Sequence, residues 1–241
     1  VILSEKGWIR AAKGLEFDHS GLAYRSGDSF LTKVSGRSNQ NVILMDSTGR
    51  SYSLAAHSLP SARSHGEPVS GRLNPVPGAT FCDMVMGSHD EALSLSTTAG
   101  YGFIGRLGEL ETKNKAGKAS LSVPKGGAII AAQRVPHKDT DLIAAVSNEG
   151  RLLVFPASDL PELSKGKGNK IISIPSANVQ SGREFMSHIA VVSAGKTLVL
   201  YAGKRLLRLK SSDLEHYKGE RGRRGHKLPR GFQLVTGTDV E

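Results

Sequence analysis

The chain has 241 residues, a formal net charge of +10 and 28 glycines, and only 5% of its residues are aromatic. Its 38% of hydrophobic residues are too many for a disordered chain, and no apolar run approaches the ~20 residues that a membrane-spanning helix needs. A single cysteine, Cys82, excludes an intrachain disulfide framework and a cysteine-based zinc site. The chain opens at Val1 without methionine or a signal-like leader, so we expect a segment of a longer cytoplasmic protein.

A glycine-led unit recurs five times along the chain. The five copies read GWIRAAKGLEF from Gly7, GRSYSLAAHSL from Gly49, GYGFIGRLGEL from Gly100, GRLLVFPASDL from Gly150 and GKRLLRLKSSDL from Gly203. The glycines are 42, 51, 50 and 53 residues apart, and an apolar residue follows each glycine at ten or eleven positions. A repeat of this period predicts stacked supersecondary units.

Each copy is typical of four short strands. Apolar runs on both sides of the glycine predict a β-hairpin, because glycine adopts the positive φ of such turns at little cost. A polar, basic segment follows, then a third run such as PVSGRL, ASLSV or NKIISI, and a fourth such as ATFCDMVM, GAIIAAQRV or FMSHIAVVS.

One four-stranded sheet cannot bury both of its faces alone, so the copies are expected to stack around an axis. The sequence therefore predicts an all-β, five-bladed, propeller-like disc of antiparallel blades in a single domain. The expected blades are residues 1–40, 41–91, 92–141, 142–195 and 196–241.

The positive charge is concentrated in the polar segments that follow the hairpins. Residues 204–230 alone carry ten positive and three negative charges. Glycines alternating with Lys or Arg suit a phosphate backbone, because glycine lets main-chain N–H groups approach and the long cations neutralise phosphate. These segments contain few aromatic residues, which favours duplex DNA over stacking on single strands. The predicted phosphate contacts are Lys165, Lys167, Lys170, Arg221, Arg223, Arg224, Lys227, Arg63, Lys113, Lys115, Lys118, Arg25 and Arg37.

Sites for other chemistry are not indicated. GYGFIG at 100–105 matches G-x-G-x-x-G, but a strand rather than a helix follows it, so no dinucleotide site is expected. The eight histidines lack metal-binding spacing, and no G-x-S-x-G motif occurs. We expect no catalytic residue, cofactor or metal in this chain. Two alternatives to DNA binding stay open: a propeller that docks another protein, and a propeller enzyme with a site on its inner strands.

Nine segments, spread over almost the whole chain, carry a resemblance to a known family. They are GWIRAAKG (7–14), SGDSF (26–30), DSTGRSYSL (46–54), LPSAR (59–63), GEPVSGRL (66–73), AGYGF (99–103), NKAGKA (114–119), DLPELSKGKGNKIISIPSA (159–177) and GERGRRG (219–225). On these residues the chain resembles the C-terminal domain found in the A subunit of bacterial type IIA topoisomerases, of the topoisomerase IV kind rather than the gyrase kind.

The resemblance implies a β-pinwheel of hairpin-invaded blades that binds and bends duplex DNA. It implies that the parent enzyme uses ATP and Mg²⁺ on other domains to relax supercoils and to decatenate DNA. The catalytic tyrosine of the family lies outside this chain. The implied partners are the B subunit of topoisomerase IV, the N-terminal cleavage core of the A subunit, and a chromosome-structuring complex, in the bacterial cytoplasm at the nucleoid and not at a membrane. Gyrase carries a Q-R-R-G-G-K-G box that this chain lacks, which predicts weaker wrapping of DNA.

Overall fold

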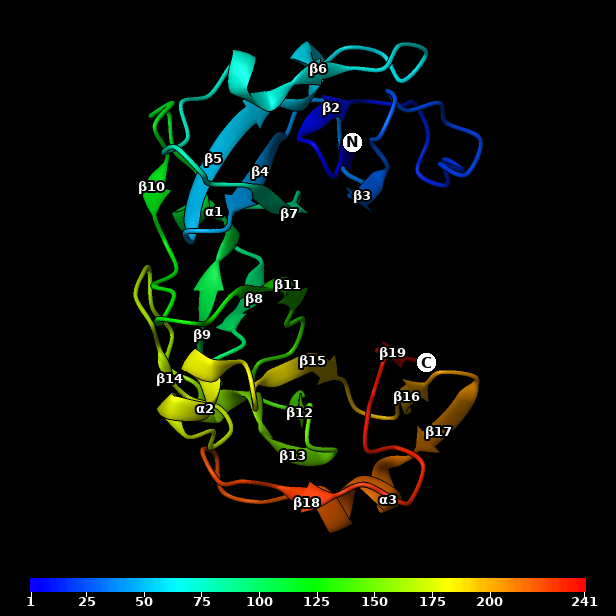
Figure 1. The fold of residues 1–241 in the computed structure, drawn as a ribbon, viewed down its shortest axis with the longest axis vertical. Helices are drawn as coiled ribbons and strands as arrows, with labels where there is room; N and C mark the ends of the chain where they lie inside the picture. The colour runs from blue at the N-terminus through cyan, green and yellow to red at the C-terminus, as the bar shows by residue number, and fades with distance from the viewer. The chain divides into compact units, whose positions relative to one another are not determined.

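The computed structural model describes all 241 residues and contains 19 strands with seven short helical turns (Figure 1). The strands form five antiparallel sheets. The longest helix, α2 (Ser176–Ser181), has six residues. No helix combines the length and the apolar character that crossing a membrane would require.

The first four sheets have four strands each, and the fifth has three. The first sheet consists of β1 (Ile2–Ser4), β2 (Trp8–Arg10), β3 (Phe30–Lys33) and β6 (Glu67–Pro68). The second consists of β4 (Asn41–Asp46), β5 (Arg50–Ala55), β7 (Phe81–Val85) and β10 (Lys118–Ala119). The third consists of β8 (Ala92–Thr97), β9 (Tyr101–Arg106), β11 (Ile129–Arg134) and β14 (Asn169–Lys170). The fourth consists of β12 (Leu142–Ser147), β13 (Arg151–Pro156), β15 (Met186–Val192) and β18 (His226–Lys227), and the fifth of β16 (Leu198–Ala202), β17 (Arg205–Leu209) and β19 (Gly237–Val240).

The remaining elements are single helical turns that follow hairpins or outer strands. They are η1 (Ala56–Ser58), η2 (Val69–Gly71), α1 (Leu107–Leu110), η3 (Ala157–Asp159), α3 (Ser211–Leu214) and η4 (Glu215–Tyr217).

All five predicted hairpins form. The turn glycines Gly7, Gly49, Gly100, Gly150 and Gly203 have φ values between +61° and +85°. Each hairpin pairs antiparallel strands, as in β12–β13, where Ala144 faces Val154 across the ladder. The all-β, five-bladed β-pinwheel class predicted from the sequence is therefore confirmed.

The third run of the second to fifth repeats pairs with the preceding sheet, whereas the first repeat has no strand between β2 and β3. β6 follows the second hairpin but pairs with β2 of the first sheet. In the same way β10 pairs with β5, β14 with β9, and β18 with β13. The predicted ranges 1–40, 41–91, 92–141 and 142–195 thus each hold three strands of one sheet, while the two-residue outer strand comes from the next copy.

The fifth sheet departs from the expected four strands. Its order is β17-β16-β19, and β17 has no outer partner in the chain. The four-strand count expected for this blade is wrong, because the outer strand of every other sheet is supplied by a following copy.

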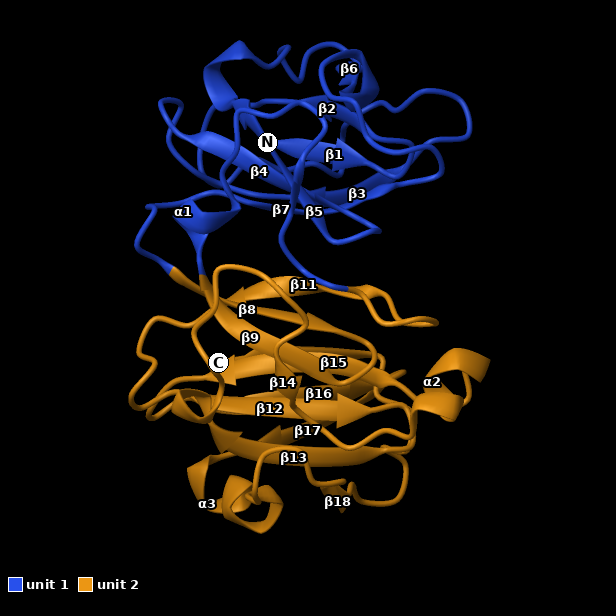
Figure 2. Ribbon diagram, turned by 90° about the vertical axis from the view of Figure 1, so that its left-hand side faces the viewer, with its two compact units in different colours: residues 1–91, 106–122 blue, residues 92–105, 123–241 orange.

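Two compact units make up the chain (Figure 2). Unit 1 comprises residues 1–91 and 106–122, and unit 2 comprises residues 92–105 and 123–241. In unit 1 one core joins the first and second sheets, with Leu3, Leu44 and Tyr52 fully buried.

Unit 2 contains two cores that share the fourth sheet. In β12, Ile143 and Ala145 belong to the core with the third sheet, whereas Ala144 and Val146 belong to the core with the fifth sheet. Successive side chains of a strand point to opposite faces, so one strand supplies both cores. This explains why β12 reads as a continuous apolar run rather than an alternating one.

Candidate nucleic-acid interface

Four basic loops occupy equivalent places, one before each outer strand. We call them the crossing loops: residues 60–66 before β6, 111–117 before β10, 161–168 before β14 and 218–225 before β18. Each loop carries the chain from one copy of the repeat to the outer edge of the preceding sheet. Most of the predicted phosphate contacts lie in these loops or in the strands that follow them.

A glycine ends every crossing loop. Gly66, Gly117, Gly168 and Gly225 have φ values of +85°, +77°, +77° and +76°. A Cβ added to Gly66 or to Gly168 would overlap a carbonyl oxygen of the preceding sheet. A Cβ added to Gly225 would lie 2.6 Å from a carbonyl oxygen, and one added to Gly117 would lie 2.6 Å from the Tyr52 ring. Only glycine has both the backbone freedom and the small size that this packing requires.

These four glycines therefore serve the fold. From sequence, the glycines of the basic segments were interpreted as openings for phosphate to reach main-chain N–H groups. The packing of an added Cβ leaves that interpretation as a prediction, but the N–H groups of two of these glycines are already bonded: Gly66 donates to Ser64 Oγ at 3.1 Å and Gly117 to Asn114 O at 2.9 Å. Gly166, by contrast, has φ +126° and no atom within 4 Å of an added Cβ, so its surroundings are open.

Three arginines hold the crossing loops by their main chain. Arg50 donates from Nε to Ala116 O at 3.0 Å and from Nη2 to Gly117 O at 2.8 Å. Arg151 donates from Nη1 to Gly225 O at 3.0 Å, and Arg10 from Nη1 to Ser64 O at 2.7 Å. None of the three is among the residues predicted from the sequence.

A signal for two of them is present in the repeat. Arg50 and Arg151 directly follow the turn glycines of their hairpins. Because these guanidinium groups are bonded to loop carbonyls, we assign them to loop placement and not to ligand contact.

Aromatic side chains follow the turn glycines of the first and third sheets, where the residues are Trp8 and Tyr101. Tyr101 lies opposite Lys170 in the β9–β14 register. The Lys167 Nζ lies 4.3 Å from the Tyr101 ring centroid and the Lys170 Nζ lies 6.0 Å from it. Cation–π attraction to the Tyr101 ring helps to hold the two ammonium groups in place, and both lysines are exposed.

Two crossing loops of unit 2 are joined into one basic surface. Arg221 donates from Nη1 to Lys170 O at 2.6 Å, and the Gly222 N–H donates to Ile171 O at 2.9 Å. The Ser173 N–H donates to Arg223 O at 3.0 Å. We call this the unit 2 ledge, defined by residues 165–170 and 221–227. All seven cations predicted for these two loops lie on it, and only Arg221 is half-buried.

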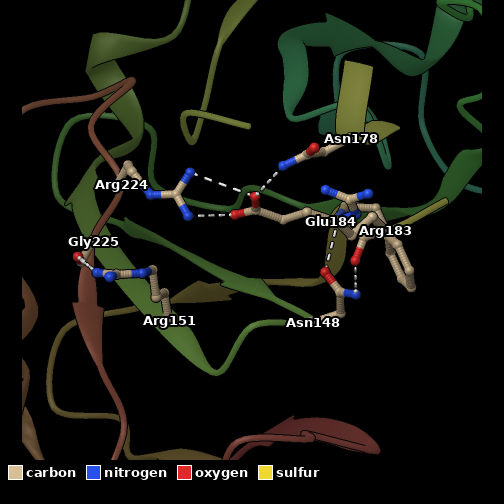
Figure 3. Close-up of polar contacts among 8 residues, drawn as sticks. Asn148, Arg151, Asn178, Arg183, Glu184, Arg224 and Gly225 are labelled. Atoms are coloured by element: carbon tan, nitrogen blue, oxygen red, sulfur yellow. Dashed lines mark hydrogen bonds and ion pairs between the residues drawn. The ribbon is translucent and has the colours of Figure 1, made fainter. Parts of the chain in front are cut away.

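Arg224 has a carboxylate partner (Figure 3). Its Nη2 lies 2.7 Å from Glu184 Oε1, and the side chains are 43% and 6% exposed. Asn178 donates from Nδ2 to Glu184 Oε2 at 3.1 Å. The Asn148 side chain holds the main chain on both sides of Glu184: it donates to Arg183 O at 3.0 Å and accepts from the main-chain N–H of Phe185 at 2.8 Å. A phosphate would have to compete with Glu184 for Arg224.

Arg223 is paired differently. Its Nη2 lies 2.9 Å from Glu220 Oε2, but both side chains are 73% exposed. An ion pair this exposed is worth little, so Arg223 is free to exchange its partner for phosphate.

The predicted cations of unit 1 do not form one group. Lys113 and Lys115 are exposed on the crossing loop before β10, whereas the Lys118 Nζ donates to Glu109 O at 2.5 Å. Arg25 stacks on Trp8 with 4.4 Å between its guanidinium carbon and the ring centroid. The segment around Arg25 leads to β3 and to no outer strand, so its grouping with the other basic loops is wrong.

Arg37 and Arg63 are both exposed, and both line a cavity in unit 1. No group of three or more His, Cys, Asp or Glu side chains in the structure could hold a metal ion.

The chain is similar to known proteins along its length. Residues 141–193 match the family model described as DNA gyrase C-terminal domain, beta-propeller. The chain is 58% identical to the A subunit of DNA topoisomerase 4 from Pseudomonas aeruginosa over 98% of its own length, which is 31% of that protein. It is 44% identical to the corresponding protein of Escherichia coli K12 over 100% of its own length, which is 32% of that protein. The chain thus spans about a third of the curated relatives it matches.

Solved structures share the fold. The structure of the E. coli ParC C-terminal domain superposes with a TM-score of 0.90 and 43% identity, and the match covers 100% of this chain and 97% of that one. The structure of a DNA gyrase A C-terminal domain superposes with a TM-score of 0.68 at 16% identity, covering 100% of this chain and 81% of that one. At that identity the second match concerns the fold alone.

Proposed function

This chain belongs to the family of C-terminal domains that the A subunits of DNA topoisomerase IV carry, and from that premise we propose that it binds duplex DNA without sequence preference. The observation that carries the proposal is the unit 2 ledge. There Lys165, Lys167, Lys170 and Arg223 are exposed on a main chain that hydrogen bonds from two neighbouring sheets hold in place. Fixed cations lose little freedom when they meet phosphate, and phosphate contacts do not read base sequence.

The proposal extends to the whole enzyme. There the domain would bend a duplex and present it for ATP-dependent strand passage, with the B subunit and the N-terminal cleavage core of the A subunit as partners. Under this proposal, other domains cleave the DNA strands and bind ATP and Mg²⁺. The holoenzyme relaxes supercoils and decatenates DNA at the bacterial nucleoid. A chromosome-structuring complex is proposed as a further partner.

Salt dependence of binding to a short duplex tests the proposal on this domain. Each phosphate contact contributes about −0.9 to the slope of log K against log salt, so seven contacts predict a slope of about −6. Because Glu184 engages Arg224, we expect about −5, which corresponds to roughly six contacts.

Two double variants distinguish the contribution of the unit 2 ledge to DNA binding from the effect of net charge. Lys165→Glu/Lys167→Glu should lower the affinity and flatten the slope by about 2. The control Lys196→Glu/Lys204→Glu makes the same change in net charge at exposed turns of the fifth sheet, and its slope should match the wild type. A wild-type slope shallower than about −2, or equal effects of the two variants, would exclude the ledge as a multi-contact DNA site.

A further inference from the structure

Unit 1 contains a cavity of about 1050 Å³ that lies outside the unit 2 ledge, and two of the phosphate contacts predicted from the sequence, Arg37 and Arg63, line it. Three segments line it: residues 11–17 after β2, residues 33–38 from the end of β3, and residues 56–63 from η1 into the first crossing loop. Its volume is slightly above the ~300–1,000 Å³ usual for ligand pockets. We call it the basic cavity.

The charge around the cavity has one sign. Its lining includes Lys13, Lys33, Arg37, His57 and Arg63, and contains no Asp or Glu. The Lys33 Nζ donates to Phe17 O at 3.3 Å. Asp18 interacts with Lys33, but it does not line the cavity. The lining itself therefore carries an excess of positive charge, which favours an anionic occupant.

The floor of the cavity is apolar. By the floor we mean Ile2, Ala56 and Met86, which line the cavity and are 3%, 7% and 2% exposed. Leu15, also in the lining, is 76% exposed, the highest value among the large apolar side chains of the chain. A partner's apolar side chain that covered Leu15 would remove its exposed apolar surface from water, which is favourable.

We infer that the basic cavity binds an extended acidic peptide segment of a partner protein. One apolar side chain of the segment would cover Leu15 and enter the floor, and its carboxylates would face Lys13, Lys33 and Arg37. Duplex DNA does not suit this site, because its phosphates lie on a stiff convex cylinder and offer nothing to an apolar floor. A small inorganic anion would leave most of the cavity unfilled. The inference does not depend on DNA binding.

Anisotropy of a fluorescein-labelled peptide tests this site. The probe alternates glutamate with leucine, and the matched control peptide has serine in place of leucine. The homologous E. coli domain has been solved at this length, so the isolated domain is a suitable reagent. We expect the leucine peptide to bind at least tenfold more tightly than the serine peptide.

Two variants assign the binding to the cavity. Lys13→Glu/Lys33→Glu should lower the affinity for the leucine peptide about tenfold. Lys196→Glu/Lys204→Glu makes the same change in net charge and should leave that affinity within twofold of the wild type. Leu15→Ser alters only an exposed side chain, so it preserves the fold, and it should reduce the preference for the leucine peptide, because the floor remains but Leu15 no longer packs on the peptide.

Three outcomes would overturn the inference. They are equal binding of the two peptides, equal loss in the two double variants, and a loss of short-duplex binding in Lys13→Glu/Lys33→Glu as large as the loss of peptide binding. The last would assign the cavity to the DNA surface. Neither Lys13 nor Lys33 is among the proposed phosphate contacts, so failure here leaves the DNA proposal untouched.

Discussion

Replacing Gly168 by alanine tests whether close packing on β9 holds the lysines of the unit 2 ledge in place. Gly168 has φ +77°, and an added Cβ would overlap the carbonyl of Gly102 and lie 3.0 Å from its Cα. Gly102 is itself paired with Asn169 in the β9–β14 ladder, so neither backbone can move without breaking that pair. Gly195 provides the control, since its φ is +78° and nothing lies within 4 Å of its added Cβ.

Both substitutions lower the free energy of unfolding through the positive φ, but only Gly168→Ala also breaks contacts with a neighbouring strand. A non-glycine residue at positive φ costs about 1–2 kcal/mol, partly offset by the smaller entropy of the unfolded chain. Gly195→Ala should therefore cost about 1 kcal/mol. Gly168→Ala must also detach β14, losing ladder hydrogen bonds worth about 0.5–1.5 kcal/mol each and the stacking of Lys167 on Tyr101, for a total of about 3 kcal/mol.

Calorimetry measures the change in Tm of each variant, and DNA titration measures its salt slope. A chain of this size loses about 2–4 °C in Tm per kcal/mol, so we expect a drop of roughly 3 °C for Gly195→Ala and roughly 9 °C for Gly168→Ala. Gly168→Ala should also flatten the DNA salt slope by about 2, since Lys165, Lys167 and Lys170 lose their common support. Equal Tm losses in the two variants would refute the close-packing argument. An unchanged salt slope in Gly168→Ala would refute the link to DNA.

Two further predictions concern the fourth sheet. Arg224→Gln should lower the stability by about 1–2 kcal/mol, because it leaves the buried Glu184 carboxylate without its cation. It should flatten the slope of log K against log salt by less than the ~0.9 that one phosphate contact contributes. Tm and the DNA titration check this, and a full loss of ~0.9 would make Arg224 a phosphate contact. Burial lowers the pKa of His188 below its ordinary 6.5, against a smaller opposing effect of its hydrogen bond with the Thr236 backbone. The folded state then binds fewer protons than the unfolded state, so stability should fall as pH drops below about 6.5. His188→Gln should reduce the Tm difference between neutral and mildly acidic pH, and an unchanged difference would contradict the assignment.

The hairpins could be predicted from the sequence because their determinants are local. A turn glycine such as Gly49 or Gly150 and the apolar runs beside it lie within about a dozen residues. The strand period and the positive φ of the turn need no distant partner to be recognised. For the same reason the basic loops, the all-β class and the family could be identified from residues alone.

The outer strands could not be paired from the sequence. Each has only two residues, which is too short for any periodicity to be read, and its paired residues lie 58 to 76 positions earlier in the chain. Tertiary packing alone decides that β14 crosses to β9.

The same limit applies to the candidate interface. Lysines and arginines were identified by type, but type does not show which cations are already engaged. Only the fold brings Arg224 to Glu184, 40 residues away, and places Lys167 over Tyr101. Whether a cation is free for phosphate depends on what packing sets beside it, and residues distant in the chain become neighbours only when the sheets assemble.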